Sequence, residues 1–277
     1  MTSSAASRPI SNSSPKTLDL EPYPGEMIKP AELIDLSDVS NLTLSARRMY
    51  NALIAKAFGP DMAAEGQEFT ISLAELRGTH DSNDRIGESV DALMKTVVVV
   101  RLADGGERKF QLLGGNDMDS PTRPHGMFTY SFDRRLAAVL ADSTVFGKLD
   151  LKAMMCFSTR YALALYEAIA RRARLQFVFS EEFNLEAFRD LLGVAKGKLT
   201  TYGNLNNRAI KPAVAEVNAY ARFGVKVMPI KSGRKVSGVH VGWWQKEEEE
   251  LRETFVEVTR HSAGRKARLS GTVETIA

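Results

Sequence analysis

The sequence predicts an α+β fold of two tandem winged-helix domains, mainly helical with small β-hairpin wings. Three observations lead to this prediction. Helical patterns followed by two strand patterns occur once within residues 31–149 and again within 150–245. Positive charge is concentrated in the second of these segments. The length of 277 residues suits two domains of about 100–200 residues each.

In the first domain (31–149), helical and strand patterns alternate in the order helix, short helix, helix, β-hairpin. The elements expected, in order, are a helix over 44–58, a strand over 69–71, a short helix over 72–76 capped by Ser72, a helix over 85–95, a strand over 97–100 that opens a hairpin, a strand over 126–132 and a helix over 133–140. This is the order of a winged helix. The domain is acidic, with 13 Lys and Arg against 18 Asp and Glu over 31–150. We therefore expect it to position the DNA backbone or to self-associate, and not to read bases.

The second domain (150–245) repeats that order. Its expected elements are a helix over 158–174 that starts at Ser158, a short strand over 177–179, a helix over 185–192 capped by Asn184 and ended by Gly193, a helix within 204–220, and strands over 225–230 and 236–244 joined by a turn at 232–233. The repetition concerns the order of elements and not the residues themselves.

The helix expected within 204–220 has the composition of a DNA recognition helix. Its buried stripe follows the spacing i, i+3, i+4, i+7 and comprises Ile210, Ala213, Val214 and Val217. Away from this stripe lie Asn204, Asn207, Arg208 and Lys211. Amides and guanidinium groups pair with adenine and guanine edges in the major groove. An ordinary surface helix is the alternative reading of the same residues.

Pro212 complicates this helix, because proline lacks an N–H and clashes with the preceding turn. Either the helix starts near Ile210, with the proline in its first turn, or it starts near Asn204 and bends. The sequence leaves both possibilities open.

Cations and hydroxyls that could hold phosphates flank this helix on two sides. The upstream set is Lys196, Lys198, Thr200, Thr201 and Tyr202, and the set at the tip of the expected wing is Lys231, Arg234 and Lys235. Residues 151–246 carry 16 Lys and Arg against 6 Asp and Glu. Such a concentration is typical of a domain that binds a polyanion. The alternative is a basic domain neutralised by its acidic neighbour.

Both ends of the chain differ from the two domains in composition. Residues 1–30 are rich in Ser and Pro at their start and predict a disordered tail. Residues 246–277 predict a charged helix followed by a frayed basic end, with the glutamates of 247–250 on a solvated face. A partner-binding role for these glutamates is the alternative.

The composition excludes several other classes of protein. No apolar run approaches the roughly 20 residues of a membrane span, and the N-terminus lacks the apolar core of a signal peptide, so we expect a cytoplasmic protein. The single cysteine, Cys156, lies in an apolar run and predicts a buried thiol. The four histidines lack metal-ligand spacing, and the loop 193–199 lacks the spacing and the magnesium-binding hydroxyl of a phosphate loop. We expect no cofactor and no enzymatic activity.

Four pieces of the second domain together resemble the iteron-binding plasmid replication initiators, a family of tandem winged-helix proteins. They are YALALYE (161–167), LLGV (191–194), RAIKPA (208–213) with the following Glu216, Val217 and Asn218, and GRK (233–235). The spacing among them fits the family. The resemblance covers about residues 150–245 and is only architectural over 31–149.

The resemblance implies a function and a set of partners. The second domain would read a repeated origin site in double-stranded DNA through the helix at 204–218, with Arg208 and Lys211 at the family's basic positions. The first domain would hold the backbone and supply the surface of a homodimer in equilibrium with the monomer. Such initiators bind direct repeats as monomers, repress their own gene as dimers, open an AT-rich segment, and act with the host initiator and the replicative helicase. Asn206-Asn207 stands where the family often has adjacent basic residues.

Two other functions fit a tandem winged helix. One is a transcriptional repressor with no role in replication, which would bind a lone palindrome. The other is an interaction module that binds only protein and shows no salt-dependent affinity for any duplex. Direct repeats beside the gene favour the initiator.

Overall fold

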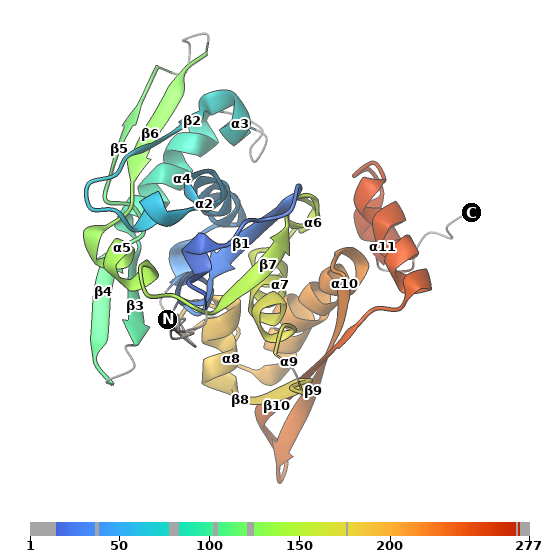
Figure 1. Cartoon of the computed structure of the whole chain (residues 1–277). Coiled ribbons are helices and arrows are strands. Elements are labelled where there is room, and N and C mark those ends of the chain that lie inside the picture. Colours follow the sequence, from blue (N-terminus) through green and yellow to red (C-terminus); the bar gives the residue numbers. More distant parts are fainter. Residues whose placement is uncertain are drawn as a thin grey trace, which may run out of the picture.

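Two helical halves, each carrying small antiparallel sheets, lie side by side in the computed structural model (Figure 1). The structure describes residues 15–36, 39–77, 83–101, 105–120, 125–175, 177–269 and 271. Buried hydrophobic side chains form one cluster that extends from Leu18 to Trp243. Among the described residues, no helix combines the length and the apolar character needed to cross a membrane.

The first half contains every helix predicted for it. Its helices are α1 (Ala31–Ile34), α2 (Leu44–Ala57), α3 (Leu73–Arg77), α4 (Asn83–Lys95) and α5 (Arg134–Leu140), with single 3-10 turns η1 (Thr17–Asp19), η2 (Val39–Asn41) and η3 (Pro60–Ala63), and its strands are β1 (Glu26–Pro30), β2 (Phe69–Ser72), β3 (Val97–Arg101), β4 (Glu107–Gln111), β5 (Gly115–Met118), β6 (Met127–Ser131) and β7 (Phe146–Asp150). Ser72 caps α3 as predicted, because its Oγ accepts from the Glu75 N–H at 3.1 Å.

The strands of the first half form three separate antiparallel sheets. β3 and β4 make the predicted hairpin, and β2, β6 and β5 make a sheet in that order. The sequence did not predict β5, because Gly, Asn and Asp are residues that strands usually avoid. It becomes a strand by pairing with the apolar β6.

The prediction of a disordered tail over 1–30 is wrong for its described part. β1 pairs antiparallel with β7, in a register that joins Glu26 to Asp150 and Pro30 to Phe146. Met27 and Ile28 are each only 1% exposed, and the preceding η1 buries Leu18. An apolar pair this short is not a strand signal by itself, and its partner lies more than a hundred residues later. Residues 1–14 lie outside the described residues.

The second half contains the predicted helices and hairpin with shifted boundaries. Its helices are α6 (Leu151–Cys156), α7 (Arg160–Arg172), α8 (Leu185–Leu192), α9 (Tyr202–Leu205), a π-helical segment η4 (Asn206–Ile210), α10 (Lys211–Tyr220), α11 (Glu248–Thr259) and α12 (Arg265–Leu269), and its strands are β8 (Ser180–Asn184), β9 (Phe223–Ser232) and β10 (Lys235–Gln245). The strands form one antiparallel sheet in the order β8-β10-β9.

Three local predictions in the second half are corrected. The strand expected over 177–179 starts instead at Ser180, because Phe177 has a φ of 67°, which no strand residue adopts. Helix α7 is capped by Thr159, whose hydroxyl accepts from Ala162 N at 3.1 Å, and not by Ser158. The basic end expected to fray forms α12, which an ion pair of 2.8 Å between Arg268 and Glu257 of α11 holds in place. Residues 272–277 of that expected tail lie outside the described residues.

A buried polar network joins β1, α2 and α7 inside the hydrophobic cluster. The ammonium of Lys29 lies 3.0 Å from a carboxylate oxygen of Glu167 and donates to Asn51 Oδ1 at 2.8 Å. Asn51 in turn donates to the other oxygen of Glu167 at 2.6 Å. These three residues are no more than 4% exposed. Burial lowers the pKa of the Lys29 ammonium, and the carboxylate of Glu167 opposes this shift.

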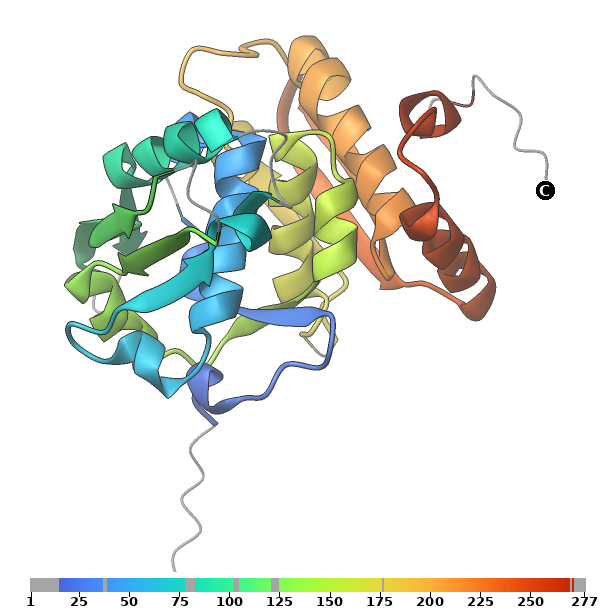
Figure 2. The same ribbon diagram turned by 90° about the horizontal axis from the view of Figure 1, so that it is seen from above.

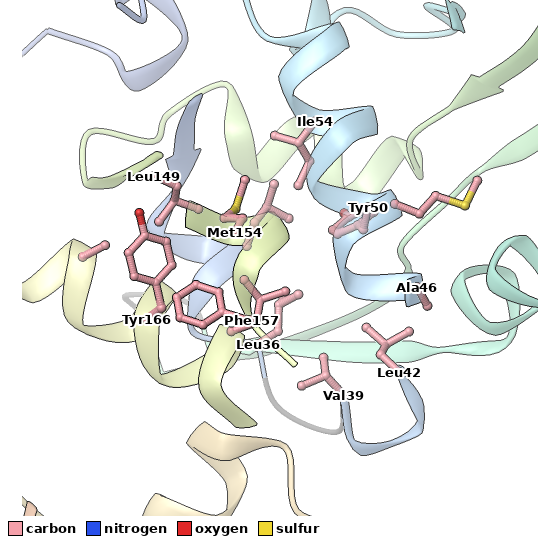
Figure 3. Close-up of a cluster of buried hydrophobic side chains, with 14 of the residues drawn as sticks. Leu36, Val39, Leu42, Ala46, Tyr50, Ile54, Leu149, Met154, Phe157 and Tyr166 are labelled. Carbon is pink, nitrogen blue, oxygen red and sulfur yellow. The ribbon is translucent and has the colours of Figure 1, made fainter. Parts of the chain in front are cut away.

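Hydrophobic side chains surround this network on the side of the second half. Figure 3 shows Tyr50 and Ile54 of α2 in one cluster with Met154 of α6, Phe157, and Tyr166 of α7. Tyr166 also donates no-water support to the chain, since its hydroxyl accepts from the Asp150 N–H at 2.7 Å. The interior between the two halves is therefore continuous, and α7 forms part of it.

We expect Lys29→Met to lower the free energy of unfolding by about 3 kcal/mol, because it leaves the Glu167 carboxylate buried without its ammonium. The Arg47 guanidinium, 3.9 Å from Glu167, keeps the loss at the low end of what such breaks cost. Urea unfolding measures the change. The matched control is Lys95→Met, which breaks an exposed pair of 2.8 Å with Asp91 and should change stability by less than about 1 kcal/mol. Equal losses in both variants would contradict a structural role for the buried network.

Candidate nucleic-acid interface

The predicted recognition helix is one helical stretch from Tyr202 to Tyr220, built from α9, η4 and α10. Thr201 caps its start, because its hydroxyl accepts from the Asn204 N–H at 3.3 Å. The π-helical turn lies directly before Pro212, where an α-helix would lose a hydrogen bond and meet the proline ring. Of the two possibilities left by the sequence, the early start is correct, and the widened turn accommodates the proline.

One face of this helix is buried as its apolar stripe predicts. Ile210 is 2% exposed, Ala213 and Val217 are fully buried, and Val214 is partly buried. Leu205, Ala209 and Tyr220 extend the same face in both directions. The helix packs on α7 with this face, and Tyr220 meets Phe157 edge to face at 5.7 Å between ring centroids.

The opposite face carries the four side chains predicted to contact bases. Asn204, Asn207, Arg208 and Lys211 are all exposed. They follow each other at i, i+3, i+4 and i+7, so they lie along one side of the helix. The side chain of Tyr202, at the start of the helix, is half-buried, and burial raises the pKa of its hydroxyl. That hydroxyl stays protonated and can donate a hydrogen bond.

The loop before the helix is held in place by Arg189 of α8. Its guanidinium donates to the carbonyl oxygens of Thr200 at 2.8 Å and Leu199 at 3.2 Å, and the residue is 8% exposed. Gly193 ends α8 in the left-handed conformation with a φ of 68°. The loop therefore presents Lys196, Lys198, Thr200 and Thr201 on the surface, next to the first turn of the helix. The sequence analysis did not single out Arg189, because an arginine on a short helix carries no distinguishing pattern.

The second set of predicted contacts lies at the tip of the β9–β10 hairpin. Lys231, Arg234 and Lys235 are exposed, and Ser232 pairs with Lys235 across the turn. Gly233 supports this turn with a φ of 61°. Figure 1 shows the tip projecting away from the body of the protein, so the structure brings the helix and loop residues together and holds the hairpin residues apart from them as a wing.

Asn218 and Glu216, quoted in the resemblance without a role, fix the recognition helix to its neighbours. Asn218 exchanges two hydrogen bonds with the backbone of Val225 in β9, of 2.7 Å and 3.0 Å. Glu216 accepts from the backbone N–H of Ser158 at 2.7 Å and from its hydroxyl at 2.6 Å. Burial raises the pKa of Glu216, and the bonds from Ser158 partly offset that shift.

Lys246 makes a third attachment at the end of the helix. Its ammonium donates to the carbonyl oxygen of Asn218 and, at 2.6 Å, to the hydroxyl of Thr254 in α11. A cation placed at a helix C-terminus also interacts favourably with the helix dipole. The recognition helix is thus fixed to the wing, to the start of α7 and to α11.

The described residues offer no arrangement suited to a metal ion, since no three or more His, Cys, Asp or Glu side chains among them gather at one point. Cys156 is buried, as its apolar surroundings predict, and burial raises the pKa of its thiol. Neither observation tests for catalysis, so the absence of enzymatic activity stays a prediction.

Comparisons with known proteins identify both halves. Residues 26–170 match the model described as initiator replication protein, WH1, and residues 184–243 match the model described as initiator Rep protein, WH2. A solved structure of the Pi initiator protein in complex with iteron DNA is similar over 81% of this chain and 98% of its own, with 19% identity and a TM-score of 0.58. Domains 2 and 3 of RctB are similar over 79% of this chain and 86% of theirs, with 11% identity and a TM-score of 0.42. No curated protein matches in sequence.

We expect Asn218→Ala and Asn207→Ala to have opposite effects, although both remove an amide from the same helix. Asn218→Ala leaves the Val225 N–H and C=O without partners and should cost about 1–3 kcal/mol of stability. Asn207→Ala should leave stability within about 0.5 kcal/mol and weaken binding to a specific duplex. Thermal unfolding and a DNA titration of both variants measure this. A stability loss from Asn207→Ala as large as that from Asn218→Ala would contradict the outward orientation of Asn207.

Proposed function

Since this chain belongs to the family of initiator replication proteins, we propose that it binds direct repeats in its origin through the exposed side of the Tyr202–Tyr220 helix. The observation that carries the proposal is the set of amide and cationic side chains on that side, fixed from behind by Asn218 and Glu216. The Pi initiator, which shares the fold, is solved with iteron DNA.

Each group of residues would have its own task on the duplex. Asn204 and Asn207 suit adenine edges, and Arg208 suits the O6 and N7 acceptors of guanine. The loop from Lys196 to Thr201 lies beside the helix start, where cations and hydroxyls can hold the phosphates that border the groove. The projecting wing, with Lys231, Arg234 and Lys235, would hold the backbone further along.

The first domain would bind a second stretch of backbone. Two winged helices on successive major grooves span about two helical turns, roughly 20 bp. On this proposal the protein binds repeats as a monomer, forms a homodimer that represses its own gene, and acts with the host initiator and replicative helicase in the cytoplasm. It would open DNA by binding and would catalyse no reaction itself.

The test is an electrophoretic mobility shift with the DNA upstream of this gene, titrated against random duplex at fixed salt. A ladder of discrete complexes, one for each direct repeat, is the expected result. A single complex on a palindrome would replace the proposal with binding at an operator. No preference over random duplex would remove specific recognition altogether.

We expect Arg208→Ala and Lys211→Ala to weaken binding to the repeat by about 1–3 kcal/mol each, with much smaller effects on random duplex, because they act at base edges. Arg234→Ala should weaken both and reduce the slope of log affinity against log salt by about 0.9, because it removes one phosphate contact. Titrations at several salt concentrations measure both quantities. The assignment of roles fails if all three variants lose the same affinity on repeat and random DNA.

A further inference from the structure

Helix α11 turns an apolar ridge outward, away from the domain on which it packs. Its inner side buries Thr254 against α10. On the outer side Leu251 and Phe255, one turn apart, are 36% and 69% exposed, and the adjacent Val256 is 46% exposed. Exposed apolar side chains that gather on one rigid element, as these do, mark a contact surface more often than isolated ones do.

An acidic rim surrounds this ridge. Residues 247–257 contain six glutamates and a single arginine. Arg252 pairs with Glu248 at 2.5 Å, Glu257 pairs with Arg268, and Glu249 and Glu253 are exposed. The ridge therefore fits an apolar hollow with a basic border.

Such a hollow lies on the first half of the same chain. A cavity of about 320 Å³ between η3, β2 and α5 is lined by the apolar side chains of Met62, Phe69, Phe132 and Ala137, among others. Glu65 and Arg134 line it too and form an exposed ion pair of 3.0 Å.

A basic groove adjoins that cavity and shares Glu65 and Arg134 with it. This groove, of about 510 Å³, also contains Arg108 and Lys109 of β4 and Arg135 of α5, together with Glu107. Its four cations exceed its two carboxylates. An apolar hollow beside a cationic groove has the shape and charge that the ridge of α11 requires.

The ridge and the hollow lie at opposite ends of the molecule. Both views place α11 at one end and the α5 and β4 side at the other (Figures 1 and 2). One molecule therefore cannot bring its own ridge into its own hollow, but two copies in a row can. Copies bound to direct repeats are related by a screw along the DNA, so any contact between them joins two different surfaces, head to tail.

We propose that copies bound to adjacent direct repeats contact each other through these two surfaces. Leu251 and Phe255 of one copy enter the hollow of the next, while Glu249 and Glu253 face Arg108 and Arg135. The contact makes binding to adjacent repeats cooperative. This inference rests on the proposed function, because it needs each copy to bind one repeat.

The experiment compares duplexes that carry one or two copies of the repeat found upstream of the gene. With two repeats, the wild-type protein should bind the second site roughly tenfold more tightly than the first, within the usual range of coupling between sites. Phe255→Ala should remove this factor and leave single-repeat affinity unchanged. The matched control is Tyr23→Ala, which removes a 67% exposed aromatic outside both surfaces and should keep the factor. Inserting about 5 bp between the repeats turns one copy by half a helical turn and should abolish it as well.

Charge reversal tests the pairing of the two surfaces. Glu249→Arg with Glu253→Arg should lower cooperativity, Arg108→Glu with Arg135→Glu should lower it too, and the chain that carries all four changes should regain it. Absence of wild-type binding to a single repeat would overturn the proposed function. Single-repeat binding without cooperativity, or cooperativity that survives Phe255→Ala, would overturn the contact and leave α11 to another protein. Loss of single-repeat affinity in Arg108→Glu with Arg135→Glu would assign the groove to DNA and overturn it as well.

Discussion

The ion pair between Lys29 and Glu167, completed by Asn51, is the interaction on which the arrangement of the two halves depends. It connects a strand near the N-terminus, the first long helix and the helix that supports the recognition helix. Each charge is satisfied only when all three segments are in place, because a buried charge without its partner is strongly unfavourable. Hydrophobic packing around it tolerates small shifts, whereas these bonds of 2.6–3.0 Å do not. The network therefore specifies the position of α7 and, through α7, that of the DNA-binding face.

The elements that could be predicted from the sequence are those with a local signal. Caps at Ser72 and Asn184, the stop at Gly193, the apolar stripe of Ile210 and Val217 and the tip of the wing were all predicted, because neighbouring residues determine them. The exposed positions of Asn204, Asn207, Arg208 and Lys211 followed from the same stripe. Their contacts with DNA stay predictions.

What could not be predicted depends on partners far away in the chain. β1 and β5 become strands only through pairing, and neither has an alternating pattern of its own. The attachments made by Arg189 and Lys246 join polar side chains to backbone carbonyls, which no residue pattern identifies. The π-helical turn before Pro212 reconciles two readings that the sequence presents as alternatives.

The pairing of β1 with β7 has a consequence for synthesis of the protein. These strands bracket the first half, so the segment that begins it waits for the segment that ends it. Until about residue 150 has left the ribosome, Met27 and Ile28 have no strand to cover them, and until Glu167 follows, Lys29 has no counter-ion. The first domain therefore cannot complete its fold during translation before part of the second has emerged. Contacts this distant in sequence also make folding slow, because a long loop must close before they form.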